Sequence, residues 1–301
     1  MSAQGLPVRS SRGNVVVEML LGLWSGVRLL ARNRIGLLGL IGLLFFLLLA
    51  FVGPYIIPLD TKVKVDQIYA PISWEHPLGT DSQGKDVWTQ IVHGGRELIL
   101  VSVAAALLST IIGASLGALS AVAGGWLDSA LTFLTDIWLT IPQLPLLIVL
   151  AAFIRVNNPV TLVLIIGLLS WPGLLRAVRS QVLAIKQSDY IEAARVLDLG
   201  TGHIVFREIL PNMMSYITIN FILAVTAAMG FQATLVFLGV VPLSGNNWGV
   251  MIRFADTRGA IFSRDSFWYI MAPVLSIALF QLTLVALERG LAEVFNPRLR
   301  S

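Results

Sequence analysis

The sequence contains no cysteine among its 301 residues, and only 13% of its residues are charged. Without thiols the chain cannot form disulfides, use a thiolate nucleophile or hold zinc through cysteine. Ordinary soluble domains carry about 25% charged residues, so this surface is not that of a soluble domain. Hydrophobic residues instead make up 56% of the chain. This composition predicts a polytopic membrane protein.

Six apolar runs are long enough to cross a bilayer, which takes about 20 helical residues because no water inside the membrane can satisfy the backbone. Their approximate limits are 35–57, 98–123, 131–154, 160–175, 213–240 and 267–287. The fourth run is the shortest, and we expect its helix to continue past the membrane surface through residues 176–187. The predicted fold is therefore all-α, with six transmembrane helices.

The segments between these runs define the expected organisation of the chain. Its regions are an N-terminal segment (1–34), the first span (35–57), a long loop (58–97), a core with the other five spans (98–292) and a tail (293–301). Within the first region, residues 15–34 predict either an amphipathic helix lying in the membrane interface or a frayed terminal extension. The core contains a second long loop at 242–266, and both loops are large enough to present a surface to a partner.

The distribution of lysine and arginine predicts the orientation. Six spans place both termini on one side of the membrane, and positive charges concentrate in cytoplasmic segments. With the amino terminus inside, thirteen lysines and arginines lie in the inner segments and eight in the outer ones. We therefore expect both termini in the cytoplasm of a cell whose plasma or inner membrane holds the protein.

The segment between the fourth and fifth runs mixes charged and apolar residues and is too short to span. Asp189 and Glu192 have the spacing of a capping box, and Gly200 can supply a left-handed stop, which predicts a helix of about three turns over 189–199. Thr201 can cap a second short helix that Pro211 ends or kinks. The sequence therefore predicts a helix-turn-helix element at the cytoplasmic surface.

This element is expected to offer apolar area. Ala193 and Ala194 permit close approach of another surface, and the apolar side chains are those of Tyr190, Ile191, Val196, Leu197, Ile204, Val205 and Phe206. Such area calls for a partner. From composition alone, that partner is either a separate protein or the chain's own membrane domain.

The stretch EAARVLDLGTGHIVFREILPN, residues 192–212, resembles the EAA loop of importer-type ABC transporter permeases. In that loop Glu-Ala-Ala is followed by a glycine and then by Ile-Leu-Pro, and the matching positions are Glu192, Ala193, Ala194, Ile209, Leu210 and Pro211. The family's glycine is expected at position 198, where this chain has Asp198, and this departure predicts a turn displaced toward Gly200.

Three further stretches resemble the dipeptide and oligopeptide branch of that family. They are HPLGTDSQGKDVW at 76–88, LTDIWLTIPQLPLLIVL at 134–150 and the closing FNPRLR, in which Asn296 replaces the family's aspartate. The resemblance implies a type I importer fold whose substrate is a peptide, a nickel chelate or an oligosaccharide. It also implies that the chain binds no cofactor itself, because ATP and Mg belong to the partner ATPase subunits.

The resemblance implies a set of partners as well. They are a second homologous permease, two cytoplasmic ATPase subunits and an extracytoplasmic substrate-binding protein that docks on the long loops. The EAA-like loop would form a coupling helix seated in a groove of the ATPase. Its residues would be Asp189, Tyr190, Glu192, Ala193, Ala194, Leu197, Asp198, Gly200, Ile209, Leu210 and Pro211.

Two other signals point to enzymes or metal sites and are rejected. GTDSQGKD at 79–86 has the spacing of a phosphate-binding P-loop, but Asp86 stands where Ser or Thr must reach magnesium, and no apolar strand precedes it. We expect a turn there, leading into a surface helix that ends near Arg96. The three histidines show no ligand spacing, and no catalytic grouping is evident.

Polar residues inside the predicted spans mark a pathway or contacts between helices. Asp136 is expected to form a structural ion pair with Arg176 or Arg179. Asn220 and the glutamines Gln232 and Gln281 either line a pathway or make interhelical hydrogen bonds. Pro142 and Pro145 interrupt the third run.

The predicted function is thus a permease subunit of an ATP-driven importer that works by alternating access. A secondary transporter driven by an ion gradient is the first alternative, and it predicts coupling-ion carboxylates near the midplane. Asp136 is the only acid well inside a run, and it lies off centre. An enzyme of the membrane interface is the second alternative, for which no catalytic residues were found.

Overall fold

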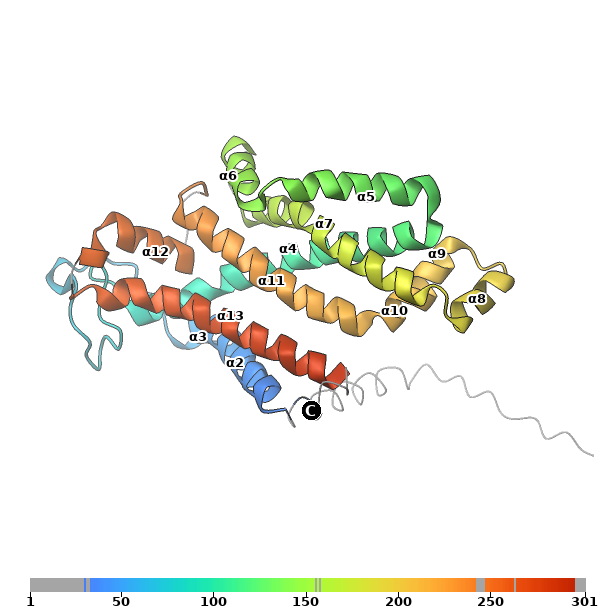
Figure 1. Cartoon of the computed structure of the whole chain (residues 1–301). Coiled ribbons are helices and arrows are strands. Elements are labelled where there is room, and N and C mark those ends of the chain that lie inside the picture. Colours follow the sequence, from blue (N-terminus) through green and yellow to red (C-terminus); the bar gives the residue numbers. More distant parts are fainter. Residues whose placement is uncertain are drawn as a thin grey trace, which may run out of the picture.

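The computed structural model describes Leu30 and residues 33–154, 156, 158–241, 247–262 and 264–295. Within these residues every regular secondary-structure element is a helix. The only β pairing there is an isolated bridge between Thr80 and Asp86. The all-α prediction is confirmed (Figure 1). Most of the expected interfacial helix at 15–34, residues 242–246 at the start of the second long loop and the closing residues 296–301 lie outside the described residues.

In the described part of the chain, five helices are individually long and apolar enough to cross a membrane. They are α2 (Arg34–Phe51), α4 (Val87–Ala123), α7 (Pro159–Ile185), α11 (Met214–Phe237) and α13 (Phe267–Phe295). The extension of the fourth predicted helix beyond residue 175 is confirmed, because α7 is continuous to Ile185. The expected separate surface helix ending near Arg96 is wrong, since those residues are the first turns of α4.

The third predicted span is not one straight helix. It consists of α5 (Gly125–Thr140) and α6 (Gln143–Ile154), which meet at an angle of 86°. The break falls at Ile141 and Pro142, where Ile141 has an extended backbone (φ −84°, ψ 122°). A proline disfavours helical geometry in the residue before it and has no N–H to continue the helix, which accounts for the position of the bend.

α4 is the central helix, packing against α2, α7 and α11 (Figure 1). Small residues on α4 let α7 approach closely. At Gly117 there is no room for a side chain, because an added Cβ would lie only 2.6 Å from the carbonyl oxygen of Leu175. α2 and α13 approach as closely, because a Cβ at Gly39 would lie 2.4 Å from the backbone nitrogen of Leu287. The spans therefore form one tightly packed bundle.

One end of the bundle, which we call the α12 end, carries the loop at 57–86 and α12 (Trp248–Thr257) (Figure 1). Short α3 (Gly53–Ile56), η1 (Val65–Gln67) and η3 (Ala260–Phe262) also lie in these connections. Trp248 is fully buried and donates from Nε1 to the carbonyl of Ile91 at 2.9 Å, which fixes α12 to α4.

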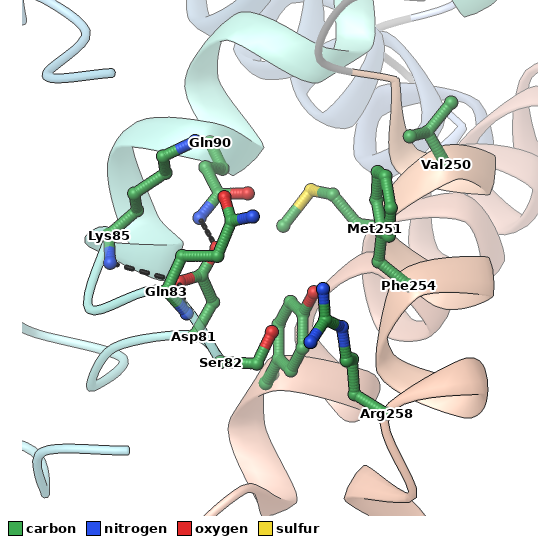
Figure 2. A pocket seen from close by; sticks show the side chains of 10 residues that line it. Asp81, Ser82, Gln83, Lys85, Gln90, Val250, Met251, Phe254 and Arg258 are labelled. Atoms are coloured by element: carbon green, nitrogen blue, oxygen red, sulfur yellow. Dashed lines mark hydrogen bonds between the residues drawn. The ribbon is translucent and has the colours of Figure 1, made fainter. Parts of the chain in front are cut away.

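The P-loop-like stretch forms a structural turn at the α12 end. Buried Asp81 accepts hydrogen bonds from the backbone nitrogens of Gln83 (2.7 Å) and Lys85 (2.9 Å) and from Nε2 of Gln90 (2.9 Å). Figure 2 shows Asp81, Ser82 and Gln83 of the loop opposite Met251 and Phe254 of α12. These residues line a small cavity of about 60 Å³. A cavity of that size holds a few water molecules, so it is a joint between loop and helices and too small for a peptide.

Candidate functional site

The opposite end of the bundle, the α8 end, carries the segment between α7 and α11 (Figure 1). It is composed of α8 (Asp189–Val196), α9 (Thr201–His203), the π-helical turn η2 (Ile204–Ile209) and α10 (Leu210–Asn212). The predicted pair of short helical pieces is therefore present, although its local details differ from the prediction at both ends of α8.

The start of α8 does not use the predicted capping box. Ser188 is the N-cap, and its carbonyl accepts from the backbone nitrogens of Ile191 (3.0 Å) and Glu192 (3.1 Å). Its hydroxyl donates backwards to the carbonyl of Ile185 at 2.6 Å, so the cap ties α8 to the end of α7. Asp189 is the first helical residue, where its charge still complements the helix dipole.

The end of α8 lies earlier than expected, and the left-handed residue is Asp198 (φ 53°), not Gly200 (φ −58°). The backbone nitrogen of Asp198 donates to the carbonyl of Arg195 (2.9 Å), and that of Leu199 donates to the carbonyl of Ala194 (3.1 Å). These two bonds form a Schellman motif, in which the left-handed position usually belongs to glycine. The predicted displacement of the turn is wrong, because aspartate tolerates this backbone region better than most residues.

Replacing Asp198 with glycine is expected to stabilise the protein by about 0.5–1 kcal/mol, because glycine has no Cβ to strain a left-handed turn. In a chain of this size the midpoint of thermal unfolding in detergent should rise by about 1–4 °C. The matched variant is Gly200→Ala, which should leave the midpoint nearly unchanged, because Gly200 has a negative φ and open space around it. If Gly200→Ala lowered the unfolding midpoint by more than Asp198→Gly raised it, the assignment of the left-handed position to Asp198 would be contradicted.

The second piece begins at Gly200 as N-cap, so the predicted cap at Thr201 is wrong. Pro211 does not end the helix. Instead the chain widens into η2 just before it, where the backbone nitrogen of Leu210 donates five residues back to Val205. A wider turn accommodates a proline that offers no N–H. The break before α11 falls at Met213 (φ −99°, ψ 6°).

The side chains of this segment divide into an inner and an outer set. Ile191, Ala194, Ile204, Val205 and Ile209 are buried in one apolar cluster with Ala114 and Ala118 of α4 and Val178 and Val182 of α7. The prediction that Ile191, Ile204 and Val205 offer exposed apolar area is therefore wrong. Ala194 is only 4% exposed, so the surface of another protein cannot contact it, whereas Ala193 is exposed.

The outer set forms an open apolar surface on α8. Val196 is 82% exposed, Leu197 72% and Tyr190 39%, with Ala193 between them. Exposed charges surround these residues, namely those of Asp189, Glu192, Arg195 and Asp198. We call this set the α8 surface. Two neighbouring bulky aliphatic side chains held open at a helix end are costly in water unless something covers them.

The other predicted coupling residues lie beside the α8 surface. Gly200 and Pro211 are exposed, Leu210 is partly buried, and Ile209 is fully buried. A shallow cavity of about 410 Å³ opens between the end of α7 and α8, lined by Lys186, Gln187, Glu192, Arg195 and Val196. The α8 surface therefore combines an apolar ridge with a hollow carrying charges of both signs.

Of the two arginines considered for Asp136, Arg176 makes the ion pair. Arg179 instead binds Asp128 with two hydrogen bonds, Nε to Oδ1 at 2.5 Å and Nη2 to Oδ2 at 2.6 Å. Ser120 donates to the same carboxylate, which links the ends of α4, α5 and α7. Sequence reasoning missed Asp128, which lies in the first turn of α5, eight residues before Asp136.

The remaining polar candidates make contacts within the bundle. Gln232 is fully buried and accepts from the hydroxyl of Ser102 on α4 (3.2 Å), and Gln281 lies 3.4 Å from the carbonyl of Thr226 on α11. Asn220 donates to the carbonyl of Tyr216 one turn earlier in its own helix (2.9 Å). Among the described residues, no three potential metal-ligating side chains of His, Cys, Asp or Glu come together.

A bundle of membrane-crossing helices that holds a short, partly uncovered helix beyond one end defines a multi-pass membrane protein. The sequence comparisons specify which class this is. The profile of the family described as binding-protein-dependent transport system inner membrane component matches residues 100–301. That of the N-terminal TM domain of oligopeptide transport permease C matches residues 22–72.

The chain belongs to the family of inner-membrane components of binding-protein-dependent transport systems. A protein of Brucella suis named as a peptide permease is 32% identical over 269 residues, which cover 89% of this chain and 88% of that protein. The dipeptide transport system permease protein DppC of Bacillus subtilis is 31% identical over 275 residues, covering 91% and 85%. The protein is a multi-pass inner-membrane permease subunit of an ABC importer of the oligopeptide and dipeptide type.

Proposed function

We propose that this permease forms half of a translocation pathway for peptides or a similar small solute, and that the α8 surface couples it to a separate cytoplasmic ATPase. The observation that carries the coupling role is the division of α8 into a buried face with Ile191 and Ala194 and an open face with Val196 and Leu197. One face holds α8 to the spans, and the other is free to bind. The names of the relatives favour a peptide substrate.

The packing explains how a movement of α8 would reach the membrane. α8 follows α7 after the short connection Lys186–Ser188, and α10 leads into α11 through the single residue Met213. The buried cluster adds α4 to this unit. A partner that pulls α8 therefore moves α4, α7 and α11 together, which is the rigid-body movement that alternating access needs.

The complete importer in this proposal contains a second homologous permease, two ATPase subunits that bind ATP and Mg, and an extracytoplasmic binding protein that docks at the α12 end. α5 and α6 together make one crossing, so the chain has six spans. α13 runs back from the α12 end to the α8 end (Figure 1). This arrangement is consistent with both termini lying in the cytoplasm with α8, as the positive charges predict.

Transport by the reconstituted complex distinguishes this function from a gradient-driven carrier. Proteoliposomes containing both permeases, the ATPase subunits and the binding protein should import a labelled dipeptide or oligopeptide only when ATP and Mg are supplied on the ATPase side. Ion gradients alone should give no import. Import that follows an ion gradient and persists without ATP would contradict the proposal.

A further inference from the structure

α5 is the least covered of the membrane helices, with Thr135 as its only buried residue. Its exposed side is nevertheless not uniformly apolar. Ser129, Asp136 and Thr140 are exposed and follow one another at intervals of seven and four residues, so they lie on one face of the helix. Thr132 lies between them, but its hydroxyl oxygen is buried. Phe133 (68% exposed) and Ile137 (47%) occupy the adjoining face.

α7 extends this polar stripe from its own side. Arg176 reaches across to Asp136, and the two side chains remain 54% and 55% exposed in spite of their ion pair. Gly173, one turn before Arg176, is exposed, and a Cβ added there would meet no atom within 4 Å. Ser180, one turn after Arg176, is exposed as well. The stripe therefore borders the α5–α7 contact and opens away from the rest of the bundle.

The stripe leads to the break between α5 and α6. Next to the break, Gln143 donates to the hydroxyl of Ser170 (2.6 Å), and Trp138 donates to the carbonyl of Leu169 (3.1 Å). These contacts place the break level with Leu169 and Ser170, about 22 Å along α7 from its last residue at a rise of about 1.5 Å per residue. Residues 169 and 170 belong to the fourth predicted span (160–175) and lie about 8 Å from its inner end, so the break falls inside that span.

The residues at the break are exposed, from Leu139 and Thr140 at the end of α5 through Pro142. Ile141 is 44% exposed and Pro142 is exposed. Of the last carbonyls of α5, that of Ile137 accepts from the hydroxyl of Thr140 and that of Trp138 from the backbone of Ile141. Within the described residues, the carbonyls of Leu139 and Thr140 accept no hydrogen bond across the break. Non-helical backbone at membrane depth cannot face lipid, so it must be covered by protein or line a water-filled space.

We propose that the polar stripe of α5 and α7, from Ser129 to the break at Pro142, lines the aqueous translocation pathway. The half-exposed ion pair favours water over a dry protein interface, because burying charges in such an interface is costly. At the break, the carbonyls of Leu139 and Thr140, which accept no hydrogen bond there from the part of the chain that the structure describes, accept hydrogen bonds from the N–H groups of a solute with a peptide backbone. This inference rests on the proposed permease function and identifies which face of the chain serves it.

The absence of cysteine makes the test direct, because a single introduced thiol is the only reactive one in this chain. Thr140→Cys and Gly173→Cys report on the stripe. Leu168→Cys is the matched control, since Leu168 is 47% exposed and lies two residues from Ser170 on the opposite side of α7. A membrane-impermeant, positively charged methanethiosulfonate is added to vesicles that hold the assembled importer, and the rate of modification is measured.

The two stripe thiols are expected to react at least about 10-fold faster than the control thiol, because the reagent needs an ionised thiol in water. Modification of Thr140→Cys should also block import. Equal, slow rates at all three positions would overturn the proposal and show that lipid or the second permease covers the stripe. ATP-dependent import by the unlabelled Leu168→Cys importer is measured in the same vesicles, so failure of the inference is separable from failure of the proposed function.

Discussion

Replacing both Val196 and Leu197 with aspartate is expected to strip the ATPase subunits from the purified permease. The side chains are 82% and 72% exposed, so the change costs the permease itself little stability. A partner groove that buries both gains about 1.5–3 kcal/mol from each, and it would instead have to desolvate two carboxylates. Affinity for the ATPase should fall at least about 100-fold. Co-purification in mild detergent measures the effect, and import should be lost in parallel.

The control for this variant is Trp74→Asp. Trp74 is fully exposed at 102%, but it lies in the loop at the α12 end. It tests whether a charge at any exposed apolar site disturbs assembly. The ATPase subunits should stay bound to Trp74→Asp as they do to the unmodified permease. Retention of the ATPase by the double aspartate variant would mean that another surface makes the contact.

Ile191→Ala is expected to separate ATP hydrolysis from transport. Ile191 is fully buried in the cluster that holds α8 to α4 and α7, and its truncation leaves a cavity costing about 2–5 kcal/mol. The substitution therefore weakens the packing of α8 against α4 and α7, while the exposed side chains of α8 stay unchanged. The ATPase should therefore still bind, but the amount of peptide imported per ATP hydrolysed should fall by about 10-fold or more.

The matched control is Ile154→Ala at the end of α6. Ile154 is 52% exposed, so the same truncation removes no buried contact, and the ratio of import to hydrolysis should be preserved. The variants are compared at equal amounts of assembled complex. An unchanged ratio in Ile191→Ala would show that α8 transmits movement without its buried face.

The positions of the spans could be predicted from the sequence because long apolar runs have few alternative explanations. The local geometry of α8 could not. By residue type, either Asp198 or Gly200 could take the left-handed position that ends α8. Which of them does so depends on where the helix packs against the apolar cluster. Likewise Ala193 and Ala194 are chemically identical, and only packing against α4 and α7 shows that Ala194 faces inward.

Two other differences have the same origin. Asp128 and Asp136 are eight residues apart on one helix, so both are within range of arginines on α7, and the sequence alone does not assign the partners. Pro142 indicated an interruption, but the angle of 86° depends on how α6 packs beside α7. It is this bend that exposes the break in the proposed pathway, and it is the feature that the sequence described least well.

The proposed coupling requires that α8 lie on the cytoplasmic side, where the ATPase must be. Arg195→Cys in this cysteine-free chain tests it most directly, since Arg195 is exposed on the α8 surface. A membrane-impermeant maleimide is applied to intact cells and to inverted vesicles stripped of ATPase, with Trp74→Cys as the thiol expected to react from outside. If α8 is cytoplasmic, Arg195→Cys reacts only in the inverted vesicles. Reaction in intact cells would contradict it.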